Sequence, residues 1–518
     1  MKLQFIMIKN LFILLFTGFS TILLGNCQEE IRPNRIGKYE PVFVPLPQNQ
    51  WVQIGTIVFE TPQNLEGQKL ILEVKSGEPI AEIQLSAKIS KDESVVLAQK
   101  SSVQGEFSLE FPKGHSQDWS RVHISVKLDP NHNLKDRLTI KPKGFLDNKE
   151  LITLTQNREI QSYRVAMPLR DFGDDGVNSY RIPGLVTSTK GTLLAVYDIR
   201  RNSSRDLQGD IDVGMSRSTD GGQTWEPMKI IMDMGTWGGL PEDQNGIGDP
   251  AILVDHETGH IWVAALWMHG KPGEMAWNSS KPGLSPQETG QFVVVKSEDD
   301  GITWSQPIIL TDQLKNPEWN LFFNGPGKGI TLKDGTLVFP AQYKDKNQMP
   351  FSTLIYSKDK GQTWHVGTGA RSNTTEAQIV ELNDGKLMLN MRDNRGGSRS
   401  IAVTSDLGKT WTEHPTSRTA LQEPVCMASL IDNPYSSGML LFSNPATEKG
   451  RHNITIKASL NDGSSWPSDM HVLLDEGTGW GYSCLTMINE EEVGILYESS
   501  VANITFQIIP LKEILGKQ

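Results

Sequence analysis

The chain has 518 residues, more than one ordinary domain needs, and with 37% hydrophobic and 21% charged residues its composition is that of a globular protein. This composition excludes a largely disordered chain and a chain that lies mainly in a membrane. The formal net charge of −11 disfavours a nucleic-acid partner, because phosphate binding needs a basic surface.

The N-terminus has the pattern of an export signal. Lys2 and Lys9 precede an apolar run over residues 11–24 that is too short to span a bilayer comfortably, so we expect residues 1–26 to be a signal peptide. The run ends in Leu24-Gly25-Asn26-Cys27, which resembles a bacterial lipobox. That resemblance implies an exported protein held at the cell surface or outer membrane through a lipid on Cys27, its only membrane contact. A plain signal peptide, giving a periplasmic or secreted protein, is the alternative.

Residues 27–156 alternate apolar and polar side chains, as in Leu70-Ile71-Leu72-Glu73-Val74. A period of two is typical of strands with one buried face, so we predict a separate N-terminal β-sandwich. Carbohydrate binding and simple packing are both open as roles for this domain.

An octapeptide recurs along the rest of the chain. Its five copies begin at Ser218, Ser297, Ser357, Thr404 and Ser459, and they end at Trp225, Trp304, Trp364, Trp411 and Trp466. In each copy an Asp or Asn can accept the N–H groups of a tight turn, a glycine permits positive φ, and the tryptophan buries a large ring. Short β-rich runs precede the copies, and repeated antiparallel hairpins of this kind predict a β-propeller over residues 157–518.

The octapeptide resembles the Asp box of sialidases and of several unrelated β-propellers, and five copies fit a ring of six blades. Because such boxes are a structural device, they predict the scaffold and leave the chemistry open. The fold class that we expect is therefore all-β: a six-bladed β-propeller with an N-terminal β-sandwich domain.

Residues 160–510 also resemble bacterial exo-α-sialidases (neuraminidases) of the Bacteroides-like type, through motifs that occur in the order of that family. The segments Tyr180-Arg181-Ile182-Pro183-Gly184, Met391-Arg392-Asp393 and Gly450-Arg451-His452 match its three carboxylate-binding arginines. Sialic acid carries a carboxylate on its anomeric carbon, and guanidinium groups bind a carboxylate bidentately. The resemblance thus implies that Arg181, Arg392 and Arg451 bind this carboxylate.

A carboxylate nucleophile would be repelled by the substrate's own carboxylate, whereas a phenol beside a base would not. Most retaining glycosidases use a carboxylate nucleophile, and sialidases are an exception that uses a tyrosine. The segment Trp480-Gly481-Tyr482 resembles the nucleophile strand of the family, and Thr374-Thr375-Glu376 resembles the segment of its base. The resemblance therefore implies that Tyr482 is the nucleophile and Glu376 its base. Glu381 is expected to alternate away from Glu376.

The leaving oxygen needs an acid. The family carries an Asp on a loop that follows the first arginine, and Asp206 matches this position. Asp210 and Asp212 are competitors in the same stretch.

Three further matches and two tryptophans concern the surroundings of the sugar. Tyr497-Glu498 resembles the closing motif of the family, which implies that Glu498 orients Arg181. Arg200 and Asp249 match positions near the 4-hydroxyl. Trp267 and Trp277 are either apolar walls for the N-acetyl group or buried core side chains.

The function implied by the resemblance is that of a retaining exo-α-sialidase. It would release terminal sialic acid from glycoproteins, glycolipids such as gangliosides, and oligosaccharides through a tyrosyl–sialyl intermediate. Transfer of sialic acid to another sugar or within the substrate, and a non-catalytic propeller that binds sialoglycans, are the alternatives. The sequence has no metal-ligand cluster, so we expect neither metal nor cofactor. Cys426 and Cys484 are expected in the core, paired or free.

Overall fold

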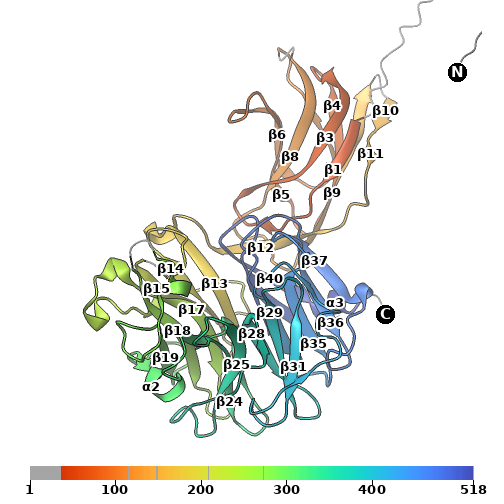
Figure 1. Ribbon diagram of the computed structural model, residues 1–518. Coiled ribbons are helices and arrows are strands. Elements are labelled where there is room, and N and C mark those ends of the chain that lie inside the picture. Colours follow the sequence, from red (N-terminus) through yellow and green to blue (C-terminus); the bar gives the residue numbers. More distant parts are fainter. Residues whose placement is uncertain (1–36, 115–116, 148–149, 208, 272–273, 517–518) are drawn as a thin grey trace, which may run out of the picture. The chain divides into compact units, whose positions relative to one another are not determined.

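The computed structural model describes residues 37–114, 117–147, 150–207, 209–271 and 274–516. The predicted signal peptide and Cys27 lie outside these residues. The all-β prediction is confirmed, since the helices are the short segments α1 (Ala276–Ser279), α2 (Thr311–Leu314) and α3 (Leu511–Ile514) and a few 3-10 turns (Figure 1). In the part of the chain that the structure describes, no helix is long and apolar enough to span a membrane.

Strands cover most of residues 37–156. One sheet has the order β11-β1-β3-β8-β5-β6, and β4 lies between β7 and β9 in another sheet, where β10 also pairs with β9. The bounds are β1 (Gly37–Pro41), β2 (Leu46–Pro47), β3 (Trp51–Asn64), β4 (Lys69–Lys75), β5 (Ile80–Lys88), β6 (Ser94–Val103), β7 (Gly105–Glu110), β8 (Asp118–Lys127), β9 (Arg137–Asp147), β10 (Glu150–Thr153) and β11 (Thr155–Gln156). Leu70, Leu72 and Val74 are buried, as their alternation predicts. That these strands form a separate sandwich domain stays a prediction.

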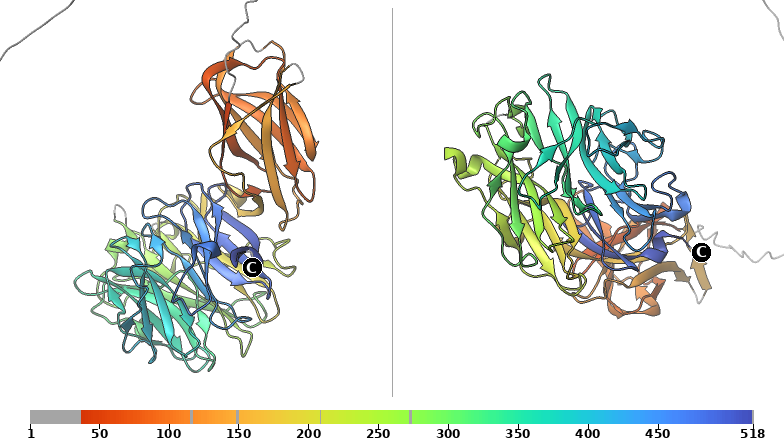
Figure 2. Two further views of the ribbon diagram at one scale, coloured as in Figure 1. Left: turned by 90° about the vertical axis from the view of Figure 1, so that its right-hand side faces the viewer. Right: turned by 90° about the horizontal axis from the view of Figure 1, so that it is seen from below.

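The remaining strands form antiparallel sheets that follow one another in chain order around the propeller, from yellow to blue in Figure 2. The first are β13 (Ser179–Thr187), β14 (Leu193–Arg200), β15 (Ile211–Ser218) and β16 (Lys229–Met232), then β17 (Asn245–Val254), β18 (Ile261–His269), β19 (Gln291–Ser297) and β20 (Ile308–Ile309), then β21 (Leu321–Asn324), β24 (Leu337–Lys344), β25 (Pro350–Ser357) and β26 (His365–Val366). Next come β28 (Thr374–Glu381), β29 (Leu387–Asp393), β31 (Ser400–Thr404) and β32 (Thr412–Glu413), and β34 (Ser429–Asp432), β35 (Leu440–Pro445), β36 (Ile454–Ser459) and β37 (His471–Asp475).

The last sheet contains β38 (Ser483–Met487), β39 (Glu492–Tyr497) and β40 (Ile504–Pro510), and β12 (Tyr163–Arg170) pairs with β40. A strand from the start of the propeller thus completes the sheet at its end. The two-residue strands β22 (Gly327–Lys328), β23 (Ile330–Thr331), β27 (Arg371–Ser372), β30 (Gly397–Ser398) and β33 (Gln422–Glu423) pair at the margins. The count of six blades stays a prediction.

The octapeptides form tight turns, as predicted. In the first copy Ser218 donates a hydrogen bond to Asp220, and the backbone N–H of Thr224 donates to the same carboxylate at 3.0 Å. Hydrogen bonds from Thr303 lower the pKa of Asp299 in the second copy to about 2. Gly301 has a φ of +81°, and a Cβ there would meet Leu194 Cδ2 at 2.3 Å, so glycine is required. The carboxylates of Asp220 and Asp299 therefore accept hydrogen bonds from their own turns and stabilise them.

Candidate active site

One cavity of about 430 Å³ contains most of the predicted site residues. Those that line it are Arg181, Asp206, Asp249, Glu376, Arg392, Arg451 and Tyr482. Arg181 and Glu376 are the third residues of β13 and β28, Asp249 is the fifth residue of β17 at its register shift, and Tyr482 immediately precedes β38. The cavity therefore lies at the end of the propeller where these inner strands begin.

Irregular backbone directs three of these side chains. The pairing register shifts between Arg181 and Gly184, between Gly248 and Ala251, and between Thr374 and Ala377. Such bulges re-aim side chains and are common beside active sites. Ile182 and Asp249 have φ values of 61° and 56°, which non-glycine residues adopt rarely. Irregular backbone thus accompanies these cavity residues.

Glu498 holds Arg181 in place. The buried carboxylate of Glu498 accepts Arg181 Nε–H at 2.6 Å and the backbone N–H groups of Ile182 and Tyr482 at 3.0 Å each. The guanidinium carbon of Arg181 lies 4.3 Å from the ring centroid of Trp480. One acid therefore fixes the arginine and both backbone segments, which agrees with the expected orienting role.

The other two arginines also face the cavity. Arg451 donates to the carbonyl oxygen of Trp480 at 2.9 Å, and among the described residues it forms no ion pair with an acid. Arg392 Nη1 donates to Glu376 at 2.7 Å, while its buried Nε finds no hydrogen-bond partner in the described structure. All three guanidinium groups thus border the cavity, and Arg451 is the one without an acidic ion-pair partner among the described residues, so its N–H groups are available to an anionic ligand.

Tyr482 lies between these charges. Its hydroxyl donates a hydrogen bond to Glu376 and accepts one from Arg392 Nη1 at 3.0 Å. The guanidinium carbons of Arg181 and Arg451 each lie 5.6 Å from its ring centroid. Burial, and then the charge of Glu376, raise the pKa of Tyr482 well above its usual value. The phenol is therefore protonated at rest and has an acceptor for its proton already in place.

Asp206 extends from the loop after β14 and is bound by Arg200, whose Nη1 donates to it at 2.6 Å. Partial burial would raise the pKa of Asp206, but Arg200, together with Arg181 and Arg451, holds it below its ordinary value. The competitors Asp210 and Asp212 pair with Arg201 and do not line the cavity.

Arg200 is fully buried and does not itself line the cavity. It donates to Asp198 at 2.8 and 3.0 Å, and Asp198 in turn accepts the backbone N–H of Asp249 at 2.8 Å. Burial raises the pKa of Asp198 to about 6, and burial followed by the charges of Asp198 and Asp206 raises that of Asp249 well above its usual value. The raised pKa favours the protonated form of Asp249, which can donate a hydrogen bond to a hydroxyl. Arg200 and Asp249 were both predicted to lie near the 4-hydroxyl, and only Asp249 lines the cavity and can contact a ligand.

Part of the cavity lining is an apolar wall, whose residues pack in one cluster. It is formed by Leu207, Leu266, Trp277, Leu321 and Phe323. Trp277 packs edge-on against Phe323 with ring centroids 6.4 Å apart. Trp267 is fully buried against Trp237 instead, so of the two alternatives for these tryptophans Trp277 is a wall and Trp267 a core residue.

Sequence reasoning missed three polar residues. Gln342 and Thr375 line the cavity, and Gln342 Oε1 and Thr375 Oγ1 are buried without a hydrogen-bond partner in the described structure. Asp198 organises Arg200 and Asp249. The only signal for Thr375 and Asp198 was their proximity in sequence to Glu376 and Arg200, and nothing in the sequence pointed to Gln342.

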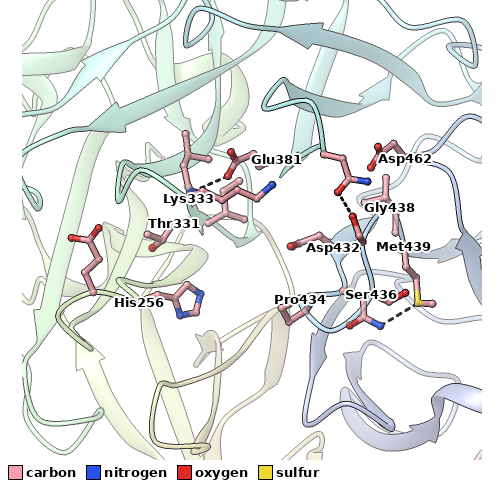
Figure 3. Close-up of a pocket in the computed structure, with 17 residues that line it drawn as sticks. His256, Thr331, Lys333, Glu381, Asp432, Pro434, Ser436, Gly438, Met439 and Asp462 are labelled. Carbon is pink, nitrogen blue, oxygen red and sulfur yellow. Dashed lines mark hydrogen bonds between the residues drawn. The ribbon is translucent and has the colours of Figure 1, made fainter.

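A second cavity, of about 470 Å³, lies elsewhere on the propeller (Figure 3). Its lining includes His256, Lys333, Glu381 and Asp432. Glu381 is the last residue of β28 and Glu376 is its third, so the two cavities lie toward opposite ends of this strand. Glu381 accepts the backbone N–H of Lys333 at 2.8 Å and is remote from Tyr482, in agreement with the choice of Glu376 as the base.

The described residues contain no group of His, Cys, Asp or Glu side chains that could hold a metal ion. Cys426 and Cys484 are both buried and free. Burial raises their pKa values to about 12 and about 11, so both are neutral thiols that pack in the interior.

Comparisons with known proteins agree with this geometry. The family described as BNR repeat-like domain matches residues 191–496. The chain is 53% identical over 398 residues to a sialidase of Bacteroides fragilis, across 76% of this chain and 73% of that protein. It is 34% identical to a sialidase of Micromonospora viridifaciens, across 63% of this chain and 50% of that protein. The solved structure of Hadza microbial sialidase Hz136 matches with a TM-score of 0.85 and 44% identity, over 92% of this chain and 99% of that chain.

Proposed function

This chain belongs to the sialidase family and is an exo-α-sialidase, a glycoside hydrolase, and from that premise we propose that it releases terminal sialic acid with retention of configuration through a tyrosyl–sialyl intermediate. The observation that carries the proposal is the contact of Tyr482 with both Glu376 and Arg392 at the bottom of a cavity lined by three arginines. A buried phenol paired with a carboxylate is what a tyrosine nucleophile requires.

Binding begins with the carboxylate of sialic acid. Arg181, Arg392 and Arg451 present several N–H donors to it, and Arg451 has no acidic ion-pair partner of its own among the described residues. Asp249, whose raised pKa favours its protonated form, donates to a ring hydroxyl. The apolar wall receives the methyl of the N-acetyl group, the largest apolar part of the sugar.

The first chemical step transfers sialic acid to the protein. The Tyr482 oxygen attacks the anomeric carbon as its proton passes to Glu376, and the bond to the leaving oxygen breaks as Asp206 protonates that oxygen. The substrate's carboxylate offsets the charges of Arg181 and Arg451, which raises the pKa of Asp206 and allows it to carry this proton.

The second step releases sialic acid. Asp206, now a carboxylate, takes a proton from a water molecule whose oxygen attacks the anomeric carbon. The bond to Tyr482 breaks, and the phenolate recovers its proton from Glu376. Two inversions at one carbon give retention.

The substrates that we propose are sialylated glycoproteins, gangliosides and oligosaccharides. We propose export as well, either as a lipoprotein anchored through Cys27 or as a periplasmic or secreted protein. The support for export is the pattern of residues 1–27 alone.

Two measurements test the mechanism. Proton NMR of a sialyllactose digest should show α-sialic acid as the first product and free lactose. Incubation with a 2,3-difluorosialic acid should add one sialyl group to the protein, and peptide mass spectrometry should locate it on Tyr482. A β-anomer released first, an anhydro or transferred product, or a label on another residue would contradict the proposal.

A further inference from the structure

A buried lysine that does not itself line the cavity contacts a residue of its apolar wall. Lys344 is the last residue of β24 and is 3% exposed. Its Nζ donates a hydrogen bond to the backbone carbonyl of Trp277 at 2.9 Å and lies 4.7 Å from the centroid of the Trp277 ring. Gln342 lies two residues earlier, on the same face of the strand, and lines the cavity. The strand therefore presents two polar groups to this region.

Among the described residues, no carboxylate forms an ion pair with Lys344 that would offset its burial. The groups that act on it are the surrounding protein, which lowers its pKa by desolvation, and the positive charge of Lys281, which lowers it further. A buried ammonium without an anionic partner is costly, and an apolar side chain of similar length would fill the same space without that cost. Packing alone therefore does not account for a lysine at this position.

Trp277 needs support from side chains. It lies on α1, in the excursion 274–290 between β18 and β19, where it takes part in no sheet pairing. A later part of this excursion is held by another buried lysine, because Lys315 Nζ donates to the carbonyl of Gly283 at 2.7 Å. Lys344 supplies the corresponding contact at Trp277, because its Nζ contacts both the backbone carbonyl and the ring of this tryptophan.

We infer that Lys344 is a positioning residue that holds Trp277 against the cavity, and that the pair determines how strongly the protein prefers substrates with an acylamino group at C5 of the sugar. The inference rests on the proposed function, in which the acyl methyl meets this wall. Once the arginines fix the carboxylate, the orientation of the ring is set, and the Trp277 face contributes binding only through the C5 substituent.

Steady-state kinetics on two methylumbelliferyl sialosides, with an N-acetylamino group or a hydroxyl at C5, tests the inference. For Lys344→Met we expect KM for the N-acetyl substrate to rise about tenfold with kcat little changed, as for the loss of a well-fitted apolar contact, and KM for the hydroxyl substrate to change by no more than about twofold. Lys344→Arg, which keeps an N–H donor, should restore part of the preference. Trp277→Ala should reproduce the loss, and adding Lys344→Met to it should cause no further change.

Lys457→Met is the matched control. Lys457 is 4% exposed, and its Nζ lies 5.6 Å from the centroid of Phe442, but it does not line the cavity. This variant should leave the ratio of the two KM values unchanged even if its thermal stability falls. An equal loss on both substrates for Lys344→Met, or additive losses in the double variant, would overturn the inference. Failure of the unsubstituted protein to hydrolyse either substrate would instead refute the proposed function.

Discussion

The hydroxyl of Tyr482 donates a hydrogen bond to the carboxylate of Glu376, although the two residues lie 106 positions apart in the chain. Arg392 Nη1 contacts both partners, at 3.0 Å and 2.7 Å. Because burial and the charge of Glu376 raise the pKa of the phenol, the proton stays on Tyr482 until an electrophile approaches. Tyr482 therefore loses its proton to Glu376, and becomes a strong nucleophile, only during the reaction.

Tyr482→Phe removes the attacking oxygen and leaves the ring in place. We expect kcat on a methylumbelliferyl sialoside to fall by at least about a thousandfold, because the covalent route is lost. Tyr435→Phe is the control, since Tyr435 is 59% exposed and outside the cavity, and it should retain full activity. A residual rate in Tyr482→Phe within tenfold of the parent would rule out the nucleophile assignment.

Glu376→Gln keeps an acceptor for the phenol but removes the base. The expected result is a loss in kcat of about a hundredfold or more, the usual contribution of a general base. The same change at Glu381, which ends β28 at the other cavity, should alter kcat little. Comparison of the two variants under identical conditions decides which glutamate acts, and a larger loss for Glu381→Gln would reverse the assignment.

The pH dependence of the reaction should report on Asp206. An acid must be protonated to act, so the rate falls as pH rises through its pKa. Arg200, Arg181 and Arg451 overcome the effect of burial and lower this pKa in the free protein, and the bound carboxylate offsets the last two. We therefore expect the alkaline limb of kcat to lie at higher pH than that of kcat/KM, measured on sialyllactose. Coincident limbs, or a reversed order, would contradict this account.

The same residue can be tested by the choice of leaving group. Asp206→Asn should lose far more activity on sialyllactose than on the methylumbelliferyl sialoside, because the phenol of the second substrate leaves without a proton. An equal loss on both substrates would argue against Asp206 as the acid.

Glu498→Gln should weaken both folding and binding. Glu498 is the buried counterion of Arg181, and breaking such a pair costs about 3–5 kcal/mol. We expect urea denaturation to show a loss of this order and KM to rise as Arg181 becomes free to turn. Glu413→Gln breaks the exposed pair with Arg371 and should cost no more than about 1 kcal/mol. Equal stabilities of the two variants would show that Glu498 does not hold Arg181.

Much of the scaffold could be predicted because its signals are local. Each octapeptide satisfies its own turn, as Asp220 does with Ser218 and Thr224, so the propeller hairpins can be read from short stretches. The candidate catalytic residues could be named only through resemblance to a family, since nothing near Arg451 or Asp206 in the chain distinguishes them from surface residues.

What the sequence by itself determined is the all-β architecture and the identity of the residues that gather at one end of the propeller. Only the tertiary structure decided which of them touch. It separated Glu376 from Glu381, placed Trp277 in the wall and Trp267 in the core, brought Gln342 and Thr375 to the cavity, and set Lys344 against Trp277. The physical reason is that turns depend on neighbours in sequence, whereas the charge balance and the shape of the cavity depend on side chains from strands far apart in the chain.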